Sequence, residues 1–260
     1  MKLAGKSAFV AAASKGLGKA VALQYAKEGA RVTIASRSLE RLAQARDEIR
    51  AETGAEVALL KMDATHAEDI RNAIRTAAAA ADGLDVLVTN AGGPRGGFFS
   101  DMSDEDWGQA FEQNLLGTIR MIREALPFMK AAGGGRIVNL TSTSVKQPID
   151  GLILSNVFRA GVYALTKSLA GELAKDGILI NTVAPGRIGT DRIAELDGKR
   201  AAEQGRTVEE IQAEAVKQIP LGRSGNPEEF ARHAVFYGSF ANTYVTGQAL
   251  LVDGGMVKGL

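Results

Sequence analysis

The chain has 260 residues, of which 45% are hydrophobic and 23% are charged, and it contains 30 glycines and 6 prolines. This composition is typical of a globular protein, and α/β folds of this length often form one domain. Lysine and arginine number 31 against 30 acidic residues, so the net charge of +1 provides no basic surface for nucleic acid or an anionic membrane. Cysteine is absent, which excludes disulfides and thiolate sites. Two histidines, His66 and His233, disfavour a histidine-based zinc site.

The sequence predicts neither a signal peptide nor a membrane span. Apolar residues begin at position 7 and continue directly into a glycine turn, with no cleavable segment before them. The longest stretch without a charged side chain, residues 233–252, contains glycine and several polar residues and is a poor membrane span. We therefore expect a soluble, cytoplasmic protein.

Short β-branched apolar runs alternate with longer helical patterns along the chain. The runs predict seven strands, at residues 7–12, 31–35, 56–61, 85–89, 136–141, 178–184 and 248–252. The segments between them predict helices at residues 17–28, 39–53, 67–81, 104–132, 151–175 and 227–236. Such alternation favours a parallel sheet covered by helices on both faces and wound by right-handed crossovers. We find no repeat or linker, and we predict a single domain over residues 1–260.

One segment interrupts this alternation. Residues 191–218 are charged and helix-forming, and they contain no strand. The insert follows the carboxyl end of a strand, where ligands bind in open α/β sheets. Two interpretations fit: a mobile flap over a substrate, at about residues 187–226, or a solvated pair of surface helices. The position in the chain favours the flap.

A turn that contains two glycines follows the first strand. It runs Ala12-Ala13-Ser14-Lys15-Gly16-Leu17-Gly18 and opens a helix. A helix N-terminus presents backbone N–H groups and a partial positive charge, which favour a phosphate group. Gly16 and Gly18 permit a positive φ or a close approach that a Cβ would obstruct. The position between strand and helix is typical of a dinucleotide-binding turn, and the alternative is a tight connection that simply requires glycine.

Further short motifs follow this turn along the chain. They are Asn90-Ala91-Gly92, Asn114, Ser142, Pro185-Gly186 and Asp253-Gly254-Gly255. Together with the turn, they resemble the short-chain dehydrogenase/reductase family over almost the whole chain. The resemblance implies a Rossmann-type, doubly wound sheet of seven parallel strands in the order 3-2-1-4-5-6-7. One departure is Ala12, which stands where the family has its first turn glycine. A methyl group there is tolerable if φ stays negative.

The end of the second strand indicates which dinucleotide binds. NAD-selective Rossmann proteins carry an acidic residue there that binds the ribose 2′-hydroxyl, whereas this chain has Ser36-Arg37. Arg37 and Lys15 are cations suited to a 2′-phosphate, and basic residues at both places resemble the NADP-preferring members of the family. We therefore predict NADP(H) rather than NAD(H). The alternative is that Arg37 caps nearby structure and Lys15 is solvated.

The resemblance implies roles for further cofactor-binding residues. Asp63 would bind the adenine edge, Asn90 and Gly92 would line the adenosine side, and Ile188 and Thr190 would hold the nicotinamide amide. The complete predicted set is Ser14, Lys15, Gly16, Leu17, Gly18, Ser36, Arg37, Asp63, Asn90, Ala91, Gly92, Arg159, Pro185, Gly186, Ile188 and Thr190.

The catalytic residues of the family are only partly present. The resemblance implies that Ser142 binds the substrate oxygen and that Asn114 supports a proton-relay water. The family also uses a tyrosine as proton donor and a lysine four residues later, a spacing that Tyr163 and Lys167 have. However, the stretch that begins at Lys167 (Lys-Ser-Leu-Ala) resembles one that follows the catalytic lysine by about eight residues. This register places Ser155 at the tyrosine position and Arg159 at the lysine position. Tyr163 is then a packing residue, roughly 12 Å further along the helix than Ser155.

Neither replacement is an ordinary proton donor. A serine hydroxyl is far less acidic than a phenol, and an arginine binds ribose hydroxyls or a carboxylate but does not transfer protons. Loss of a positioned acid costs about 10² to 10⁴ in rate, while hydride transfer itself belongs to the cofactor. Lys146, four residues after Ser142, is a candidate substitute if it is desolvated, and a surface lysine is the alternative.

Two functions remain compatible with the sequence. One is an NADP(H)-dependent oxidoreductase, similar to a 3-oxoacyl reductase, that interconverts a carbonyl and an alcohol on a small-molecule substrate. The other is a catalytically silent nucleotide-binding sensor or scaffold, which Ser155 and Arg159 favour. The retained Asn114 and Ser142 and the flap favour the enzyme. Family members pair through the helices after strands four and five, so the resemblance also implies a homodimer or homotetramer. Neither nucleic acid nor a membrane is an expected partner.

Overall fold

Seven strands form one parallel sheet in the order β3-β2-β1-β4-β5-β6-β7. The computed structural model describes residues 1–259. The strands are β1 Ser7–Ala11, β2 Arg31–Ser36, β3 Val57–Lys61, β4 Val86–Thr89, β5 Gly135–Leu140, β6 Ile178–Pro185 and β7 Ala249–Val252. The predicted fold class and strand order are confirmed, and every predicted strand agrees with the observed one to within one residue at each end.

The central strands are buried because helices cover both faces of the sheet. All residues of β1, β4 and β5 are buried. Successive side chains of a strand point to opposite faces, so Phe9 and Val10 enter different hydrophobic clusters. Tyr25 and Phe230 complete the cluster around Val10, and Met121 belongs to the cluster around Phe9. Apolar burial on both faces explains why these strands read as continuous apolar runs.

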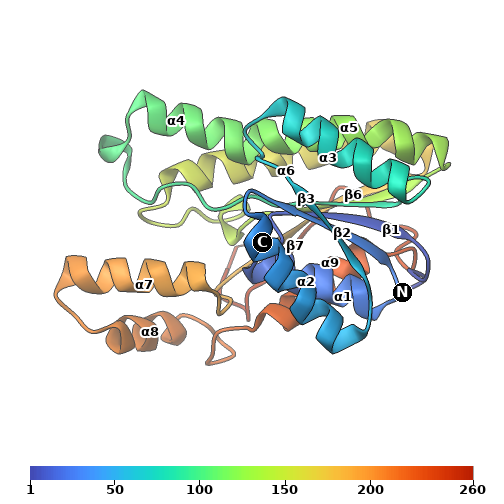
Figure 1. Ribbon diagram of the computed structural model, residues 1–260. Helices are drawn as coiled ribbons and strands as arrows, with labels where there is room; N and C mark the ends of the chain where they lie inside the picture. The colour runs from blue at the N-terminus through green and yellow to red at the C-terminus, as the bar shows by residue number, and fades with distance from the viewer. Residues whose placement is uncertain (260) are drawn as a thin grey trace.

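The helices form two layers. Helices α1 (Gly16–Lys27), α2 (Leu39–Thr53) and α9 (Pro227–Tyr237) lie on one side of the sheet, and α3 (Ala67–Ala80), α5 (Gly117–Ala131) and α6 (Ile153–Leu173) lie on the other (Figure 1). Local sequence signals set several of their starts. The Ser38 hydroxyl accepts a hydrogen bond from the backbone N–H of Arg41 at the start of α2. Asn226 and Glu229 form a capping box at the start of α9.

The helix predicted at residues 104–132 is interrupted. Helix α4 (Asp104–Phe111) is followed by a π-helical turn, η2 (Glu112–Leu116), and then by α5. A π turn adds one residue to a helical turn without breaking the helix, and such turns are frequent at functional sites. Asn114 lies in this turn and is fully buried. The prediction of one continuous helix was therefore wrong at the position of a candidate site residue.

The insert after β6 forms a pair of helices. They are α7 (Asp191–Gln204) and α8 (Val208–Lys217), and Figure 1 shows them side by side, projecting from the rest of the fold. The two helices agree with the charged, helix-forming composition of this segment. Within residues 1–259, no helix combines the length and the apolar character needed to cross a membrane.

Candidate functional site

The turn between β1 and α1 requires both of its glycines. A Cβ on Gly18 would lie 2.5 Å from the Ala12 carbonyl oxygen and 2.9 Å from Asn90 Nδ2, so no side chain fits there. Gly16 has φ +58°, a conformation that glycine adopts without strain. The N-cap residue of α1, Lys15, makes no side-chain capping bond. The first N–H groups of α1 therefore have no side-chain partner at the cap and suit an anionic ligand.

Ala12 does not meet the condition expected for a methyl group at its position. Its φ is +49°, in the left-handed region, whereas a methyl group is tolerated there without strain only at negative φ. The reason is the turn itself, since the Ala12 carbonyl accepts a hydrogen bond from Asn90 Nδ2 at 3.4 Å. An L-residue in this conformation costs about 1–2 kcal/mol relative to glycine. The turn thus keeps a glycine-type backbone without the glycine.

The two cations predicted for a 2′-phosphate are both exposed. Arg37 follows the buried Ser36 at the end of β2 and forms no hydrogen bond or ion pair with any described residue. It does not cap α2, because Ser38 performs that role. Lys15 pairs with Asp191 of the insert, with Nζ at 3.1 Å from Oδ2.

Asp63 has one carboxylate oxygen available for a ligand. Its Oδ1 accepts hydrogen bonds from the backbone N–H and the hydroxyl of Thr65, at 2.9 and 2.8 Å. Burial raises the pKa of the Asp63 carboxyl, but the two bonds from Thr65 and the nearby charge of Arg37 outweigh this effect and hold the pKa below its usual value. An ionised carboxylate with a free Oδ2 can accept a hydrogen bond from an amino group such as that of adenine.

Ser142 and Asn114 each keep one polar group available. Ser142 precedes the short 3₁₀ turn η3 (Thr143–Val145), and its Oγ accepts from the backbone N–H of Ser144 at 3.2 Å, so its O–H remains free to donate. Asn114 Nδ2 donates to the Ala110 carbonyl at 3.3 Å. Its Oδ1 is buried and has no partner among the described residues. A buried amide oxygen of this kind suits a bound water.

Arg159 joins the carboxyl ends of two neighbouring strands. Its Nη1 donates to the Leu140 carbonyl at 2.8 Å and its Nη2 donates to the Ala91 carbonyl at 3.1 Å. The side chain is buried, and no carboxylate of residues 1–259 forms a salt bridge with it. Burial lowers the pKa of the guanidinium to about 10. Ser155, one helical turn earlier on α6, is half-buried. The structure thus places a cation without a counter-ion between β4 and β5.

Lys146 is an exposed residue, so the desolvation that a catalytic role required is not found. Its Nζ lies 5.7 Å from the ring centroid of Tyr163, and Lys167 Nζ lies 5.9 Å from the same centroid. Tyr163 is half-buried. The tyrosine therefore packs against two ammonium groups, which agrees with a packing role.

The segment after β6 returns to the phosphate turn. A Cβ on Gly186 would lie 2.7 Å from Asp253 Cα, so this glycine permits a close approach of two chain segments. Ile188 is buried, and Thr190 lies above the turn, with its Cγ2 3.9 Å from where a Cβ on Gly16 would stand. The predicted cofactor residues of β1, β4 and β6 thus meet at the carboxyl edge of the sheet, as expected in open α/β folds.

Three contacts of the insert were not predicted. Asp191 pairs with Lys15, Arg192 Nη2 donates to the Pro94 carbonyl at 2.9 Å, and Arg187 pairs with Asp197. The Arg187–Asp197 pair is bidentate, at 3.0 and 2.5 Å, and Asp197 is only 2% exposed. Asp191 and Arg192 are far in sequence from Lys15 and Pro94, and no local pattern marks the pairs.

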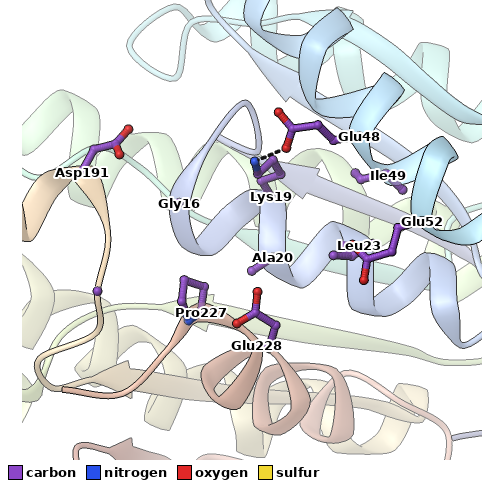
Figure 2. Close-up of a pocket in the computed structure, with 11 residues that line it drawn as sticks. Gly16, Lys19, Ala20, Leu23, Glu48, Ile49, Glu52, Asp191, Pro227 and Glu228 are labelled. Atoms are coloured by element: carbon purple, nitrogen blue, oxygen red, sulfur yellow. Dashed lines mark hydrogen bonds and ion pairs between the residues drawn. The ribbon is translucent and has the colours of Figure 1, made fainter. Parts of the chain in front are cut away.

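A hollow of about 310 Å³ lies beside the phosphate turn, between α1, α2 and the start of α9 (Figure 2). Carboxylates dominate the charge of its lining, and Lys19 is paired with Glu48 (Figure 2). The acidic lining residues are Glu48, Glu52, Asp191 and Glu228. The charge of this lining makes the hollow unsuited to a phosphate.

The comparison with known proteins agrees with this geometry. Residues 11–257 match the family model for enoyl-(acyl carrier protein) reductases. A 3-oxoacyl-(acyl-carrier-protein) reductase of Aquifex aeolicus is 37% identical to the chain over 98% of this chain and 99% of the relative. The chain belongs to the short-chain dehydrogenase/reductase family.

Two solved structures of reductases superpose closely on the chain. The L-sorbose reductase of Gluconobacter frateurii, complexed with NADPH and L-sorbose, has a TM-score of 0.94 at 31% identity and full coverage of both chains. A variant of the actinorhodin polyketide ketoreductase with NADPH has a TM-score of 0.92 at 33% identity, covering 96% of this chain and 97% of that one. The protein is thus an oxidoreductase of the short-chain dehydrogenase/reductase family.

Proposed function

We propose that the protein is an NADP(H)-dependent reductase that interconverts a carbonyl group and an alcohol on a small-molecule substrate. The observation that carries this proposal is the phosphate turn with two exposed cations, Lys15 and Arg37, and no acidic residue at the end of β2. The names of the relatives support it, because all three are reductases and both solved structures contain NADPH.

The proposed cofactor site follows the carboxyl edge of the sheet. The N-terminus of α1, with Ser14 and Leu17, receives the pyrophosphate, while Lys15, Ser36 and Arg37 receive the 2′-phosphate. Asp63 accepts from the adenine amino group, and Asn90, Ala91 and Gly92 line the adenosine side. Pro185, Gly186, Ile188 and Thr190 border the nicotinamide. The bound cofactor supplies the hydride, and the protein supplies binding and orientation.

The proposed catalytic arrangement uses Ser142 and Ser155 as hydroxyl groups that orient the substrate oxygen. Arg159 is fixed by the Leu140 and Ala91 carbonyls at the ends of β4 and β5, and we assign it the role of stabilising negative charge that develops on this oxygen. In this proposal a water held through the free Oδ1 of Asn114 donates the proton to the developing alkoxide, and the resulting hydroxide takes a proton back from solvent. This assignment makes the site an atypical one for the family, since neither Ser155 nor Arg159 releases a proton readily.

We further propose that the chain is one domain whose segment 187–226 acts as a flap over the substrate. Its first helix, α7, follows β6 and reaches the loop after β4 through Arg192, so it connects the carboxyl ends of these two strands. Assembly as a homodimer or homotetramer belongs to the same proposal, with α5 and α6 as the pairing helices.

The test combines cofactor binding with turnover. We expect calorimetry to show tighter binding of NADPH than of NADH, and NADPH consumption with at least one member of a panel of ketones, 3-oxoacyl thioesters and ketoses. Ser142→Ala should lower kcat by about 10² or more because it removes a donor to the substrate oxygen. Tyr163→Phe is the matched control and should stay within about twofold of the unaltered enzyme.

Three other outcomes would each contradict one part of this proposal. Tight NADPH binding without turnover on the whole panel favours the silent nucleotide-binding function, which Ser155 and Arg159 suggest. Loss of turnover in Tyr163→Phe shows that the register of α6 is wrong. Equal affinities for NADPH and NADH contradict the assignment of Lys15 and Arg37.

A further inference from the structure

The first residues of the insert are fastened on both sides of the proposed cofactor groove. On one side, Asp191 pairs with Lys15 of the phosphate turn, and Thr190 lies above Gly16. On the other side, Arg192 Nη2 donates to the Pro94 carbonyl in the loop after β4. Residues 190–192 therefore form a strap across the groove.

The two ion pairs of this segment differ in how easily another group can replace one of their partners. The Arg187–Asp197 pair is buried, with side chains 12% and 2% exposed, and it holds α7 to the end of β6. The Lys15–Asp191 pair is open to solvent, with side chains 57% and 73% exposed. An exposed ion pair is weak, and a phosphate dianion competes well for its lysine. The buried Arg187–Asp197 pair thus holds α7 in place, whereas a ligand can replace Asp191 as the partner of Lys15.

We propose that Asp191 competes with the 2′-phosphate of the cofactor for Lys15, so that a phosphorylated dinucleotide unfastens the strap and an unphosphorylated one leaves it fastened. This inference rests on the proposed function, which assigns Lys15 to the 2′-phosphate. The further point is that Asp191 limits the selectivity for NADP(H) and couples this selectivity to the position of the flap.

The surroundings of Asp191 explain why the carboxylate moves once Lys15 is taken. The hollow on its other side is lined by Glu48, Glu52 and Glu228 (Figure 2). The single cation of that lining, Lys19, is held by Glu48. The released carboxylate therefore finds no replacement cation in the hollow and lies close to the bound phosphates. Like charges repel, so the Asp191 side chain turns away from the phosphates and the first turn of α7 loosens, while Thr190 stays at the nicotinamide.

The binding test uses two fragments that lack the nicotinamide. Adenosine 2′,5′-bisphosphate carries the 2′-phosphate and AMP does not. In Asp191→Asn we expect the affinity for the bisphosphate, relative to AMP, to rise about two- to fivefold, the range of an exposed ion pair. Glu203→Gln removes the same charge from the far end of α7, where Glu203 faces Lys199, and should leave the ratio unchanged. In a Lys15→Met background, Asp191→Asn should also leave it unchanged.

Hydrogen exchange follows the strap directly. The backbone N–H groups of Ile193 and Ala194 donate to the Thr190 carbonyl at 2.9 and 3.1 Å and report on the first turn of α7. We expect both to exchange faster when the bisphosphate binds but not when AMP binds, and to exchange fast without ligand in Asp191→Asn.

Two failures can be told apart. If the bisphosphate binds the unaltered protein no more tightly than AMP, Lys15 does not receive a 2′-phosphate, and the proposed cofactor falls together with this inference. If the bisphosphate is preferred but Asp191→Asn changes neither the affinity ratio nor the exchange of Ile193 and Ala194, the competition alone is refuted.

Discussion

Arg159 combines burial, a positive charge and the absence of a carboxylate partner among the described residues. A buried cation is costly, and its two bonds to the Leu140 and Ala91 carbonyls recover only part of its lost hydration. A negatively charged ligand at the ends of β4 and β5 would recover more. The surroundings of Arg159 therefore favour a nearby negative charge, which agrees with the role proposed for it.

The pH dependence of turnover tests this role. Burial lowers the pKa of Arg159 to about 10, so the guanidinium keeps its charge at lower pH and loses it as the pH rises through that value. Serine does not titrate in water. We expect kcat/KM to show no ionisation of Ser155 or Arg159 between about pH 6 and pH 9, and to fall toward pH 10.

Arg159→Lys is the matched variant for this measurement. A buried lysine loses its charge at a lower pH than a buried arginine, because its ordinary pKa is lower and burial lowers it further. The fall in kcat/KM should therefore shift to lower pH in Arg159→Lys. An identical profile in both proteins would show that residue 159 does not control the reaction.

Ala12 offers a separate test of backbone strain. Its φ of +49° suits glycine, so Ala12→Gly should raise the free energy of unfolding by about 1 kcal/mol and Tm by about 2 °C. Ala13→Gly is the control, because the neighbouring Ala13 does not have a positive φ and gains nothing from glycine. Thermal unfolding of both variants distinguishes the two positions, and a lower Tm in Ala12→Gly would contradict the strain.

Residue types and spacing predicted much of the candidate site but not its internal bonds. The turn at Gly16 and Gly18 and the strand ends follow from local sequence, whereas the register of α6 that assigns Ser155 and Arg159 stays a prediction. The contacts of Arg159 do not, since its acceptors are backbone carbonyls on two other strands and any residue supplies a carbonyl. The Lys15–Asp191 pair was missed for a similar reason, because a charged side chain carries no sign of its distant partner.

Among the elements, the buried pair between Arg187 and Asp197 decides whether α7 stays docked. Removing the carboxylate in Asp197→Ala leaves the Arg187 charge poorly compensated in a site that is mostly buried. We expect this to destabilise the docked α7 by about 3–5 kcal/mol. We expect α7 to detach locally and trypsin to cleave rapidly after Lys199 or Arg200, while the sheet remains folded by circular dichroism.

Glu195→Gln is the control for this cleavage. Glu195 lies on the same helix and pairs with Arg192, but its side chain is 71% exposed and the pair contributes little. Its cleavage rate should match that of the unaltered protein. Equal rates in Asp197→Ala and Glu195→Gln would mean that the buried pair does not hold α7.

Hydrophobic periodicity predicts the strands of this fold but not its π turn. The bounds of the central strands β1, β4 and β5 could be predicted within one residue because strands buried on both faces consist of apolar runs with sharp ends. The π turn at Glu112–Leu116 could not, because an inserted residue leaves helix propensity unchanged. Helix propensity is therefore uniform along this segment and gives no sign of the π turn in which Asn114 lies.

For the whole molecule, periodicity predicts a parallel α/β sheet, whereas the strand order came from the family resemblance and was confirmed. The exposed surface adds information on assembly. Val157 on α6 and Phe111 on α4 are exposed apolar side chains, 45% and 38% accessible. Along α6, the exposed positions that continue from Val157 at helical spacing carry small side chains; they are Ala160, Ala164, Ser168 and Gly171. Small residues let a second helix approach closely, as in a pairing face.

Substitution of Val157 tests whether this face of α6 joins two copies. Sedimentation should show a dimer or tetramer for the unaltered protein and a smaller species for Val157→Arg, because a charge buried between two helices without a partner is strongly unfavourable. Leu39→Arg is the control: Leu39 is 50% exposed on α2, across the sheet, and the same change there should leave the size unaltered. Both positions are exposed in the single chain, so neither substitution should lower its stability by more than about 0.5 kcal/mol. An unchanged size in Val157→Arg would exclude this face of α6 from the assembly, and dissociation in both variants would trace the effect to surface charge in general.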